Sequence, residues 1–209
     1  MQLLSGMLGA GVIIAGGRGE RLGGDKPFRA FGGATLLGAV VERVRPQLDS
    51  LAVNIRKDYL PRCLAHWGND LEFLFDDEEW DVGPLAGVLA ALHWAKCRGA
   101  AMVATFPGDT PFLPRDLVRR LTDRSQGLAP AVASDGNRVH GLCAVWPASS
   151  YERLLHGVRN ENIRSLRQAI AYLGGCECVI DCDPRAFFNV NTPEDLLEAE
   201  RMASQAPQH

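Results

Sequence analysis

The sequence predicts a three-layer α/β protein in which helices cover both faces of a mostly parallel sheet with an antiparallel edge. Two observations carry this prediction. From Gly11 onward, short β-branched or apolar runs alternate with amphipathic segments, which is the pattern of successive βα units. After residue 128 this alternation stops. The apolar runs 129–134 and 139–146 flank an Asp-Gly-Asn turn, which indicates an antiparallel hairpin instead of a helical crossover.

The first unit is expected at 11–48. Residues 11–15 read GVIIA and form the first predicted strand. A helix over 35–48 follows, because one stripe of its surface is apolar, and Pro46 weakens its last turn. The apolar stripe consists of Leu36, Leu37, Val40, Val41 and Val44.

The next units continue the alternation. Strands are expected at 51–55, 71–75 and 101–106, because each is a short apolar run. An irregular helix is expected at 59–67, and another at 114–121. The clearest helix begins at Gly83-Pro84, where proline suits the first turn and apolar residues recur at i, i+3, i+4 and i+7. Those apolar residues are Leu85, Val88, Leu89 and Leu92.

The remainder of the chain is expected to return to helices and one strand. Helical segments are predicted at 149–155 and 162–173, a strand at 177–181, and a closing helix from Pro193. No internal repeat, low-complexity tract or linker marks a second domain. We therefore expect a single domain over 1–209, with loose tails at 1–9 and 204–209.

Composition narrows the classes of function. The 209 residues are 46% hydrophobic and 22% charged, which is typical of a globular protein with one sizeable core. A formal charge of −3 without clustered Lys and Arg argues against nucleic-acid binding. No segment has the length of a membrane-spanning helix, and no Lys or Arg precedes Arg18 as a signal peptide would require. These features predict a cytoplasmic protein without a membrane partner.

Six scattered cysteines fit a reducing compartment better than a disulfide scaffold. Cys176, Cys178 and Cys182 form the only cluster. Their spacing leaves two alternatives open, a partial zinc site or small half-buried residues on a strand, and no second cysteine pair completes a four-ligand zinc site.

The loop after the first strand favours phosphate binding. Residues 15–27 contain five glycines and three cations, so backbone N–H groups can approach phosphate oxygens while the cations neutralise charge. The loop fits neither a dinucleotide fingerprint nor a Walker A motif. A long flexible turn is the alternative. Ligands of open α/β sheets bind beyond the carboxyl ends of the strands, where this loop lies.

This loop matches the string A-G-G-x-x-x-R-[ML]-G-x-D-K, and by this string the chain resembles the MobA family of nucleotidyltransferases, the molybdenum cofactor guanylyltransferases. The resemblance covers almost the whole chain in the family's order. It continues through Val53-Asn54, Asp76, the GPLAG string at 83–87, the PGDTPF string at 107–112 and the NVNTPE string at 189–194. The resemblance implies a Rossmann-like nucleotidyltransferase fold that transfers GMP from GTP to the terminal phosphate of (molybdenum-)molybdopterin and releases pyrophosphate.

The resemblance also implies roles for individual residues. Ile14, Ala15 and Gly16 would bind the nucleotide through their backbone. Lys26 would bind phosphate, and Arg21 would offer its planar fork to pyrophosphate or form a salt bridge that orders the loop.

Asn54 and Asp76 would contact the nucleoside. Asn54 has the alternative of satisfying loop backbone, and Asp77 competes with Asp76 for the match. Asp109 would bind Mg²⁺, helped by Asn191, with a helix N-cap as its alternative use.

A second group of expectations concerns substrates and partners. Arg138 and His140 fall where the family binds the pterin, although Gly141 stands where a proline is expected. The A-G-G of the loop favours GTP over the CTP of cytidylyl-transferring relatives, which usually carry A-A-G. The presence of Lys26 and Asp109 argues against a catalytically silent nucleotide-binding regulator. Contacts with cofactor-biosynthesis proteins and with apo-molybdoenzymes are also implied.

Overall fold

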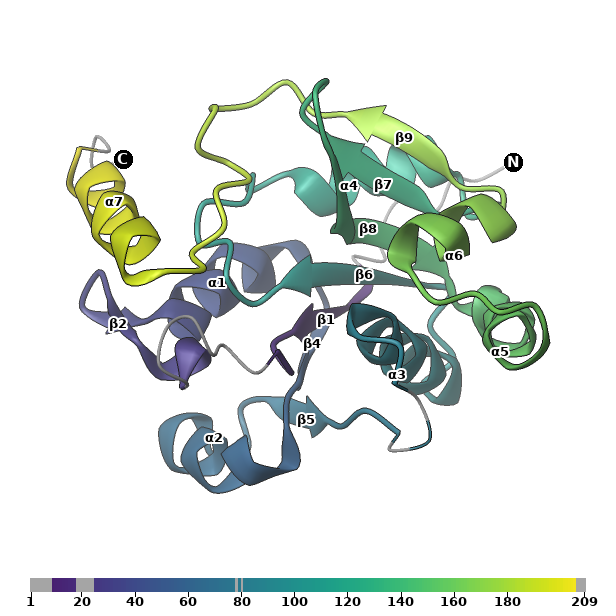
Figure 1. The fold of residues 1–209 in the computed structure, drawn as a ribbon, viewed down its shortest axis with the longest axis horizontal. Helices are drawn as coiled ribbons and strands as arrows, with labels where there is room; N and C mark the ends of the chain where they lie inside the picture. The colour runs from purple at the N-terminus through teal and green to yellow at the C-terminus, as the bar shows by residue number, and fades with distance from the viewer. Residues whose placement is uncertain (1–8, 18–24, 78, 80, 206–209) are drawn as a thin grey trace.

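The computed structural model describes residues 9–17, 25–77, 79 and 81–205. Its centre is a seven-stranded sheet in the order β5-β4-β1-β6-β8-β7-β9 (Figure 1). The neighbours from β5 to β6 pair parallel, β8 runs antiparallel to both β6 and β7, and β9 is parallel to β7. The strands are β1 (Ala10–Ile14), β4 (Ser50–Asn54), β5 (Glu72–Leu74), β6 (Met102–Pro107), β7 (Ala131–Ser134), β8 (Val139–Pro147) and β9 (Cys176–Val179).

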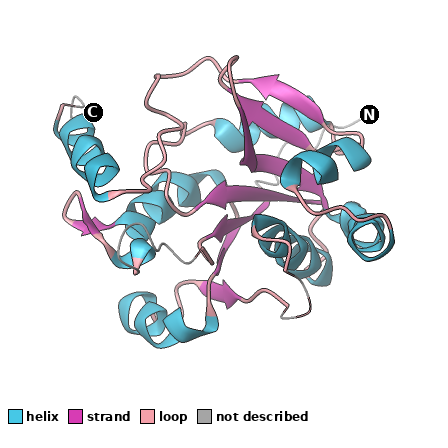
Figure 2. Ribbon diagram, viewed as in Figure 1, coloured by secondary structure: helices cyan, strands magenta, loops and turns pink. Residues whose placement is uncertain are grey.

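Helices cover both faces of this sheet (Figure 2), so the predicted α/β class is confirmed. One face is covered by α1 (Leu36–Val44), α2 (Leu60–Trp67) and α4 (Leu117–Ser125). The other is covered by α3 (Pro84–Cys97), α5 (Tyr151–Asn160) and α6 (Leu166–Tyr172). The closing helix α7 (Pro193–Ser204) begins with a capping box in which Thr192 and Asp195 bond each other's backbone.

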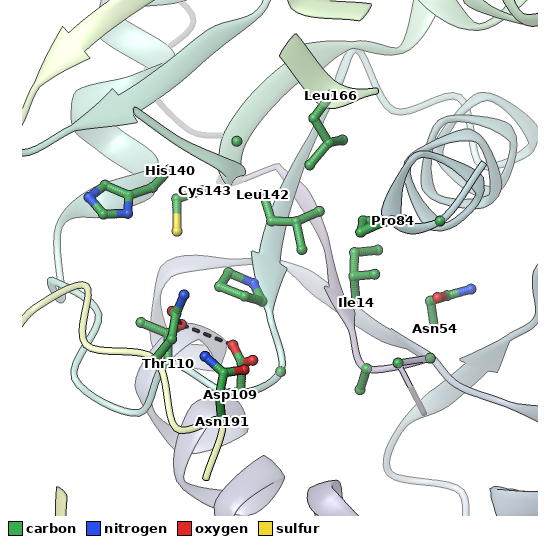
Figure 3. A pocket seen from close by; sticks show the side chains of 18 of the residues that line it. Ile14, Asn54, Pro84, Asp109, Thr110, His140, Leu142, Cys143, Leu166 and Asn191 are labelled. Atoms are coloured by element: carbon green, nitrogen blue, oxygen red, sulfur yellow. Dashed lines mark hydrogen bonds between the residues drawn. The ribbon is translucent and has the colours of Figure 1, made fainter. Parts of the chain in front are cut away.

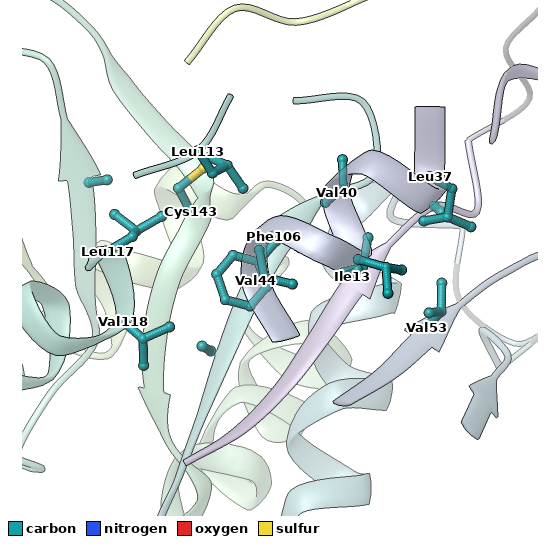
Figure 4. Packing of buried hydrophobic residues seen from close by; sticks show 14 of the residues in the cluster. Ile13, Leu37, Val40, Val44, Val53, Phe106, Leu113, Leu117, Val118 and Cys143 are labelled. Atoms are coloured by element: carbon teal, nitrogen blue, oxygen red, sulfur yellow. The ribbon is translucent and has the colours of Figure 1, made fainter. Parts of the chain in front are cut away.

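Alternation along the strands divides the core between the two faces. Ile13 packs in the cluster under α1, whereas its neighbour Val12 packs in the cluster under α3. Figure 4 shows Ile13, Val53 and Phe106, from three adjacent strands, packed beneath α1. These strands are therefore buried on both sides, which explains their continuous apolar sequence. A third cluster, including Phe31 and Ala199, attaches α7.

Helix α1 is shorter than the expected 35–48. Thr35 is its N-cap and accepts a hydrogen bond from the N–H of Gly38 at 3.0 Å, which fixes the start. The last turn is a 3₁₀ helix, η3 (Arg45–Gln47), because Pro46 has no N–H to continue the α-helical pattern.

Helix α4 begins three residues later than the expected 114–121 because the side chain of Gln47 satisfies the backbone before it. Gln47 is buried, and its Oε1 accepts from Val118 N–H at 3.1 Å. Its Nε2 donates to the carbonyls of Pro114 at 3.0 Å and Arg43 at 3.1 Å. A glutamine 71 residues away thus caps the helix.

Gln47→Leu should lower the free energy of unfolding by about 2–4 kcal/mol, because it leaves buried backbone groups without partners. Urea denaturation measures the loss. Gln205→Leu, at an exposed position after α7, should change stability by less than about 0.5 kcal/mol. A loss for Gln47→Leu as small as that of Gln205→Leu would contradict the capping role.

The structure contains a small hairpin that the sequence analysis missed. Its strands are β2 (Ala30–Phe31) and β3 (Ala34–Thr35), too short to show an alternating pattern. Gly32 and Gly33 form its two-residue turn with φ of 57° and 83°, values that favour glycine. Other 3₁₀ turns are η2 (Lys26–Phe28), η4 (Lys57–Tyr59) and η5 (Ala148–Ser150).

Three further expectations need adjustment. The helix expected at 162–173 starts only at Leu166, because Asn162 has a left-handed φ of 53° and Ser165 is the N-cap. The helix expected at 149–155 is α5, which extends to Asn160. Of the expected tails, residues 1–8 and 206–209 lie outside the described residues, while Ser204 is the last residue of α7.

The structure also bears on the cysteines and on membrane insertion. All six cysteines are free thiols, and Cys176, Cys178 and Cys182 are half-buried against the core. Within the described ranges, no three His, Cys, Asp or Glu side chains gather as a metal site. No helix in those ranges combines the length and apolarity needed to cross a bilayer.

Candidate active site

A cleft of about 690 Å³ opens at the carboxyl ends of β1, β4 and β6, where the sequence analysis placed the ligand. Figure 3 shows Asp109, Thr110 and Asn191 gathered on one side of it and Ile14, Pro84 and Asn54 on the other. Arg21 lies outside the described residues. The other predicted site residues all line the cleft: Ile14, Ala15, Gly16, Lys26, Asn54, Asp76 and Asp109.

The floor of the cleft is main chain held by strand-end hydrogen bonds. The N–H of Ala15 donates to the carbonyl of Asn54 at 2.8 Å, and the N–H of Gly108 donates to the carbonyl of Ile14 at 3.0 Å. A Cβ on Gly108 would lie 2.8 Å from the Cβ of Ala15, closer than carbon atoms can approach. Only glycine therefore lets the loops after β1 and β6 meet.

Lys26 joins three loops at one side of the cleft. Its Nζ donates to Asp109 Oδ2 at 2.6 Å and to Asn191 Oδ1 at 2.8 Å. The side chains of Lys26 and Asp109 are only 15% and 22% exposed, so water screens the pair weakly. The 3₁₀ turn η2 carries Lys26, and Pro27 fixes the backbone of that turn.

This arrangement resolves the alternative use of Asp109. Helix α4 begins at Leu117 with Asp116 as its N-cap residue, so Asp109 does not cap it. The Asp109 carboxylate instead faces the ammonium of Lys26 and the hydroxyl of Thr110 in the cleft. The N-cap alternative is therefore wrong.

Asn54 and Asp76 form a second polar pair. Asn54 is fully buried, and its Nδ2 donates to Asp76 Oδ1 at 2.8 Å. Within the described residues, the buried Asn54 Oδ1 has no hydrogen-bond partner. Burial raises the pKa of the Asp76 carboxyl, and the bond from Asn54 partly offsets the rise.

The structure places Asp76 and Asp77 differently with respect to the cleft. Asp76 lines the cleft, whereas Asp77 Oδ1 accepts from the backbone N–H of Glu79 outside it. The alternative that Asn54 only satisfies loop backbone is not what the structure shows, because its amide bonds the side chain of Asp76.

A further wall of the cleft contains Arg138, which directly precedes β8, and His140 of β8. The His140 ring stacks on Phe187 with centroids 4.1 Å apart, and its Nε2 lies 3.0 Å from Asp135 Oδ2. The N–H groups of Asn137 and Arg138, together with His140, lower the pKa of Asp135 to about 2. Gly141, found where a proline was expected, leaves room for Leu166: an added Cβ would lie 3.2 Å from the Leu166 side chain.

Sequence reasoning missed the roles of Thr110, Asn189 and Phe187, although all three line the cleft. The hydroxyl of Thr110 donates to Asn189 Oδ1 at 2.6 Å, and Phe187 supports His140. The signal for Asn189 was present, because it belongs to the NVNTPE string in which only Asn191 was singled out.

Known proteins resemble this chain over most of its length. Residues 11–174 match the MobA-like NTP transferase domain. A molybdenum cofactor guanylyltransferase from a Bradyrhizobium species is 40% identical over 200 residues, which cover 93% of this chain and 92% of the relative. A molybdenum cofactor guanylyltransferase from Cereibacter sphaeroides is 42% identical over 193 residues, covering 92% of this chain and 95% of the relative.

Solved structures share the fold at lower identity. Molybdopterin-guanine dinucleotide biosynthesis protein A from Archaeoglobus fulgidus superposes with a TM-score of 0.74 at 22% identity, covering 94% of this chain and 100% of its own. The 2-C-methyl-D-erythritol 4-phosphate cytidylyltransferase from Thermus thermophilus gives a TM-score of 0.67 at 20% identity, covering 92% and 98%. The chain is therefore a nucleotidyltransferase that belongs to the MobA-like NTP transferase family.

Proposed function

We propose that this protein transfers GMP from GTP to the terminal phosphate of molybdopterin, with or without bound molybdenum, and forms the guanine dinucleotide form of the cofactor. One observation carries the proposal: a single cleft brings together the Lys26–Asp109–Asn191 group and the Asn54–Asp76 pair. The Lys26–Asp109–Asn191 group suits phosphates, and the Asn54–Asp76 pair suits a nucleoside. Relatives at about 40% identity are named molybdenum cofactor guanylyltransferases.

The reaction is an in-line displacement at the α-phosphorus of GTP. An oxygen of the terminal phosphate of molybdopterin bonds to that phosphorus, the α–β phosphoanhydride bond breaks, and pyrophosphate leaves with the bonding electron pair. No covalent enzyme intermediate is required. The ammonium of Lys26 and the backbone amides after β1 neutralise phosphate charge, and Arg21 is proposed to hold the departing pyrophosphate.

The oxygen donors of the site fit Mg²⁺. Asp109 offers a carboxylate, and Asn191 offers an amide oxygen. Both groups accept a hydrogen bond from Lys26 Nζ. Mg²⁺ prefers a few protein oxygens together with nucleotide phosphates and water, so the lack of a three-carboxylate group among the described residues is compatible with this ion. When bound, the ion would supply positive charge to the phosphate oxygens.

The wall that contains Arg138 and His140 is proposed to bind the acceptor, because it lines the same cleft as Lys26 and Asp109. Its cation suits the acceptor phosphate, and Leu142 and Leu166 add apolar surface for a ring system. A cytoplasmic location and contacts with cofactor-biosynthesis proteins and apo-molybdoenzymes are also proposed on the basis of the family.

Pyrophosphate release by the purified protein tests the reaction. Mg²⁺ and molybdopterin are supplied with GTP, CTP or ATP in parallel reactions. Release that depends on GTP supports the proposal, whereas release with CTP would assign the protein to cytidylyl transfer. Nucleotide binding without release from any of the three would favour a silent nucleotide-binding regulator.

The affinity for GTP should fall on acidification at a higher pH than an ordinary aspartate would give. The raised pKa of Asp76 means that its carboxylate, the acceptor for the nucleoside, is protonated earlier as the pH drops. Titration calorimetry with a nonhydrolysable GTP analogue at several pH values measures this. Asp76→Asn should bind the analogue roughly tenfold more weakly at neutral pH, and its affinity should not show the fall on acidification that titration of Asp76 causes.

The melting temperature of Asp76→Asn shows whether the variant folds normally, and the expected value follows from the raised pKa of Asp76. A raised carboxyl pKa contributes stability that is present below the unfolded pKa and lost as the pH rises through the folded pKa. The uncharged Asp76→Asn should therefore keep its melting temperature at neutral pH. If the affinity of the variant for the analogue fell at the same pH as that of the wild type, Asp76 would be excluded as the cause of the fall.

A further inference from the structure

Thr110 links the metal-binding candidate Asp109 to the C-terminal segment. Its hydroxyl donates to Asn189 Oδ1 at 2.6 Å, and the same oxygen lies 3.3 Å from Asp109 Oδ1. Thr110 is 1% exposed, so bulk water does not compete for its proton. Asp109 and Asn189 are its two side-chain partners in the described part of the chain.

A hydroxyl has one proton and donates one strong hydrogen bond. A distance of 2.6 Å is short for an O–H···O bond and 3.3 Å is long, so the proton of Thr110 points to Asn189. Asp109 Oδ1 therefore keeps its lone pairs, while Oδ2 accepts from Lys26. The segment stays in place independently of the Asn189 side chain, because Val190 N–H donates to the Asp109 carbonyl at 2.9 Å.

We propose that Asn189 is a positioning residue that draws the Thr110 proton away from Asp109 and so keeps Asp109 Oδ1 open to a divalent cation. The inference rests on the proposed function, in which Asp109 binds Mg²⁺. Without an acceptor at position 189, the Thr110 hydroxyl rotates toward Asp109 Oδ1, and a cation must displace that hydrogen bond to bind. Asn189 acts through Thr110 in this role and is not itself a ligand.

A purely structural latch predicts a different result. If the Thr110–Asn189 bond only held two loops together, removing either partner would break the same bond and weaken cation binding equally. If Asn189 directs a proton, the damage caused by its loss requires the Thr110 hydroxyl. Removing that hydroxyl as well should then restore cation binding in an Asn189 variant.

The test measures Mn²⁺ binding by electron paramagnetic resonance in the presence of a nonhydrolysable GTP analogue. Asn189→Leu, which keeps the branched shape without an acceptor, should weaken Mn²⁺ binding roughly tenfold. The double variant Asn189→Leu with Thr110→Val should recover most of that affinity. Asn160→Leu, at an exposed site on α5, is the matched control and should bind Mn²⁺ like the wild type.

Three results would overturn the inference. Unchanged Mn²⁺ affinity in Asn189→Leu would remove any role for Asn189, and a double variant as weak as the single one would leave only a latch. A wild-type protein that binds the analogue but no Mn²⁺ would overturn the proposed metal site together with the inference. Asn189→Ala is measured in parallel, so that misfolding of Asn189→Leu, detected by thermal unfolding, leaves the test decisive.

Discussion

Asp109→Asn should lower kcat for pyrophosphate release about 10²- to 10³-fold, the cost of removing one group that stabilises transition-state charge. The substitution replaces the only carboxylate that the structure shows in contact with Lys26 among the described residues. An amide oxygen is a weaker ligand for Mg²⁺ than a carboxylate, so Mn²⁺ binding should weaken as well.

The fold should tolerate this change. Asparagine has the size of aspartate, and the main-chain bond from Val190 to the carbonyl of residue 109 does not involve the side chain. Lys26 also keeps its bond to Asn191. Steady-state kinetics and urea denaturation measure the two effects. Asp123→Asn, on the exposed surface of α4, controls for loss of one carboxylate. Wild-type turnover in Asp109→Asn would remove the metal assignment.

The location of the cleft could be predicted because the topology of a parallel sheet is readable in sequence. Ile14, Asn54 and Pro107 end the strands β1, β4 and β6, and parallel strands present their carboxyl ends at one edge. Residues at or just after those ends therefore had to converge. The family strings then separated these residues from other loop residues of the same types.

The contacts between distant loops could not be predicted in the same way. Lys26 meets Asn191 across 165 residues, and Thr110 meets Asn189 across 79. Sequence spacing does not indicate which loops touch, because that depends on where the segment before α7 returns to the sheet. The role of Asn189 depends in addition on the direction of one hydroxyl proton, which follows only from two distances.

The errors in helix boundaries have the same origin. Periodicity located α4 but not its start, because the cap comes from Gln47 on another element. The hairpin β2–β3 was missed because two-residue strands have no period, and only the pair Gly32-Gly33 marks its turn. Tertiary contacts decide these details, whereas the apolar pattern decides the order of elements.

Lys26→Met should lower kcat/KM for GTP about 10²- to 10³-fold, again because a preorganised charge at the phosphates is lost. Methionine keeps an unbranched, flexible side chain of similar length, so the packing of the η2 turn should persist. The turn is held by backbone bonds, including Phe28 N–H to the Asp25 carbonyl at 2.9 Å. Lys26→Arg should not restore activity, because a planar fork cannot replace a compact ammonium between Asp109 and Asn191.

The effect of Lys26→Met on metal binding should differ from that of Asp109→Asn. Removing the ammonium frees Asp109 Oδ2 and leaves the carboxylate's full charge for a cation, so Mn²⁺ affinity should stay the same or rise. Lys96→Met, which removes an exposed ammonium paired with Glu152, is the matched control for kinetics. If Lys26→Met lost Mn²⁺ binding as Asp109→Asn should, the lysine would serve to position the carboxylate, and the expected difference between the two variants would be wrong.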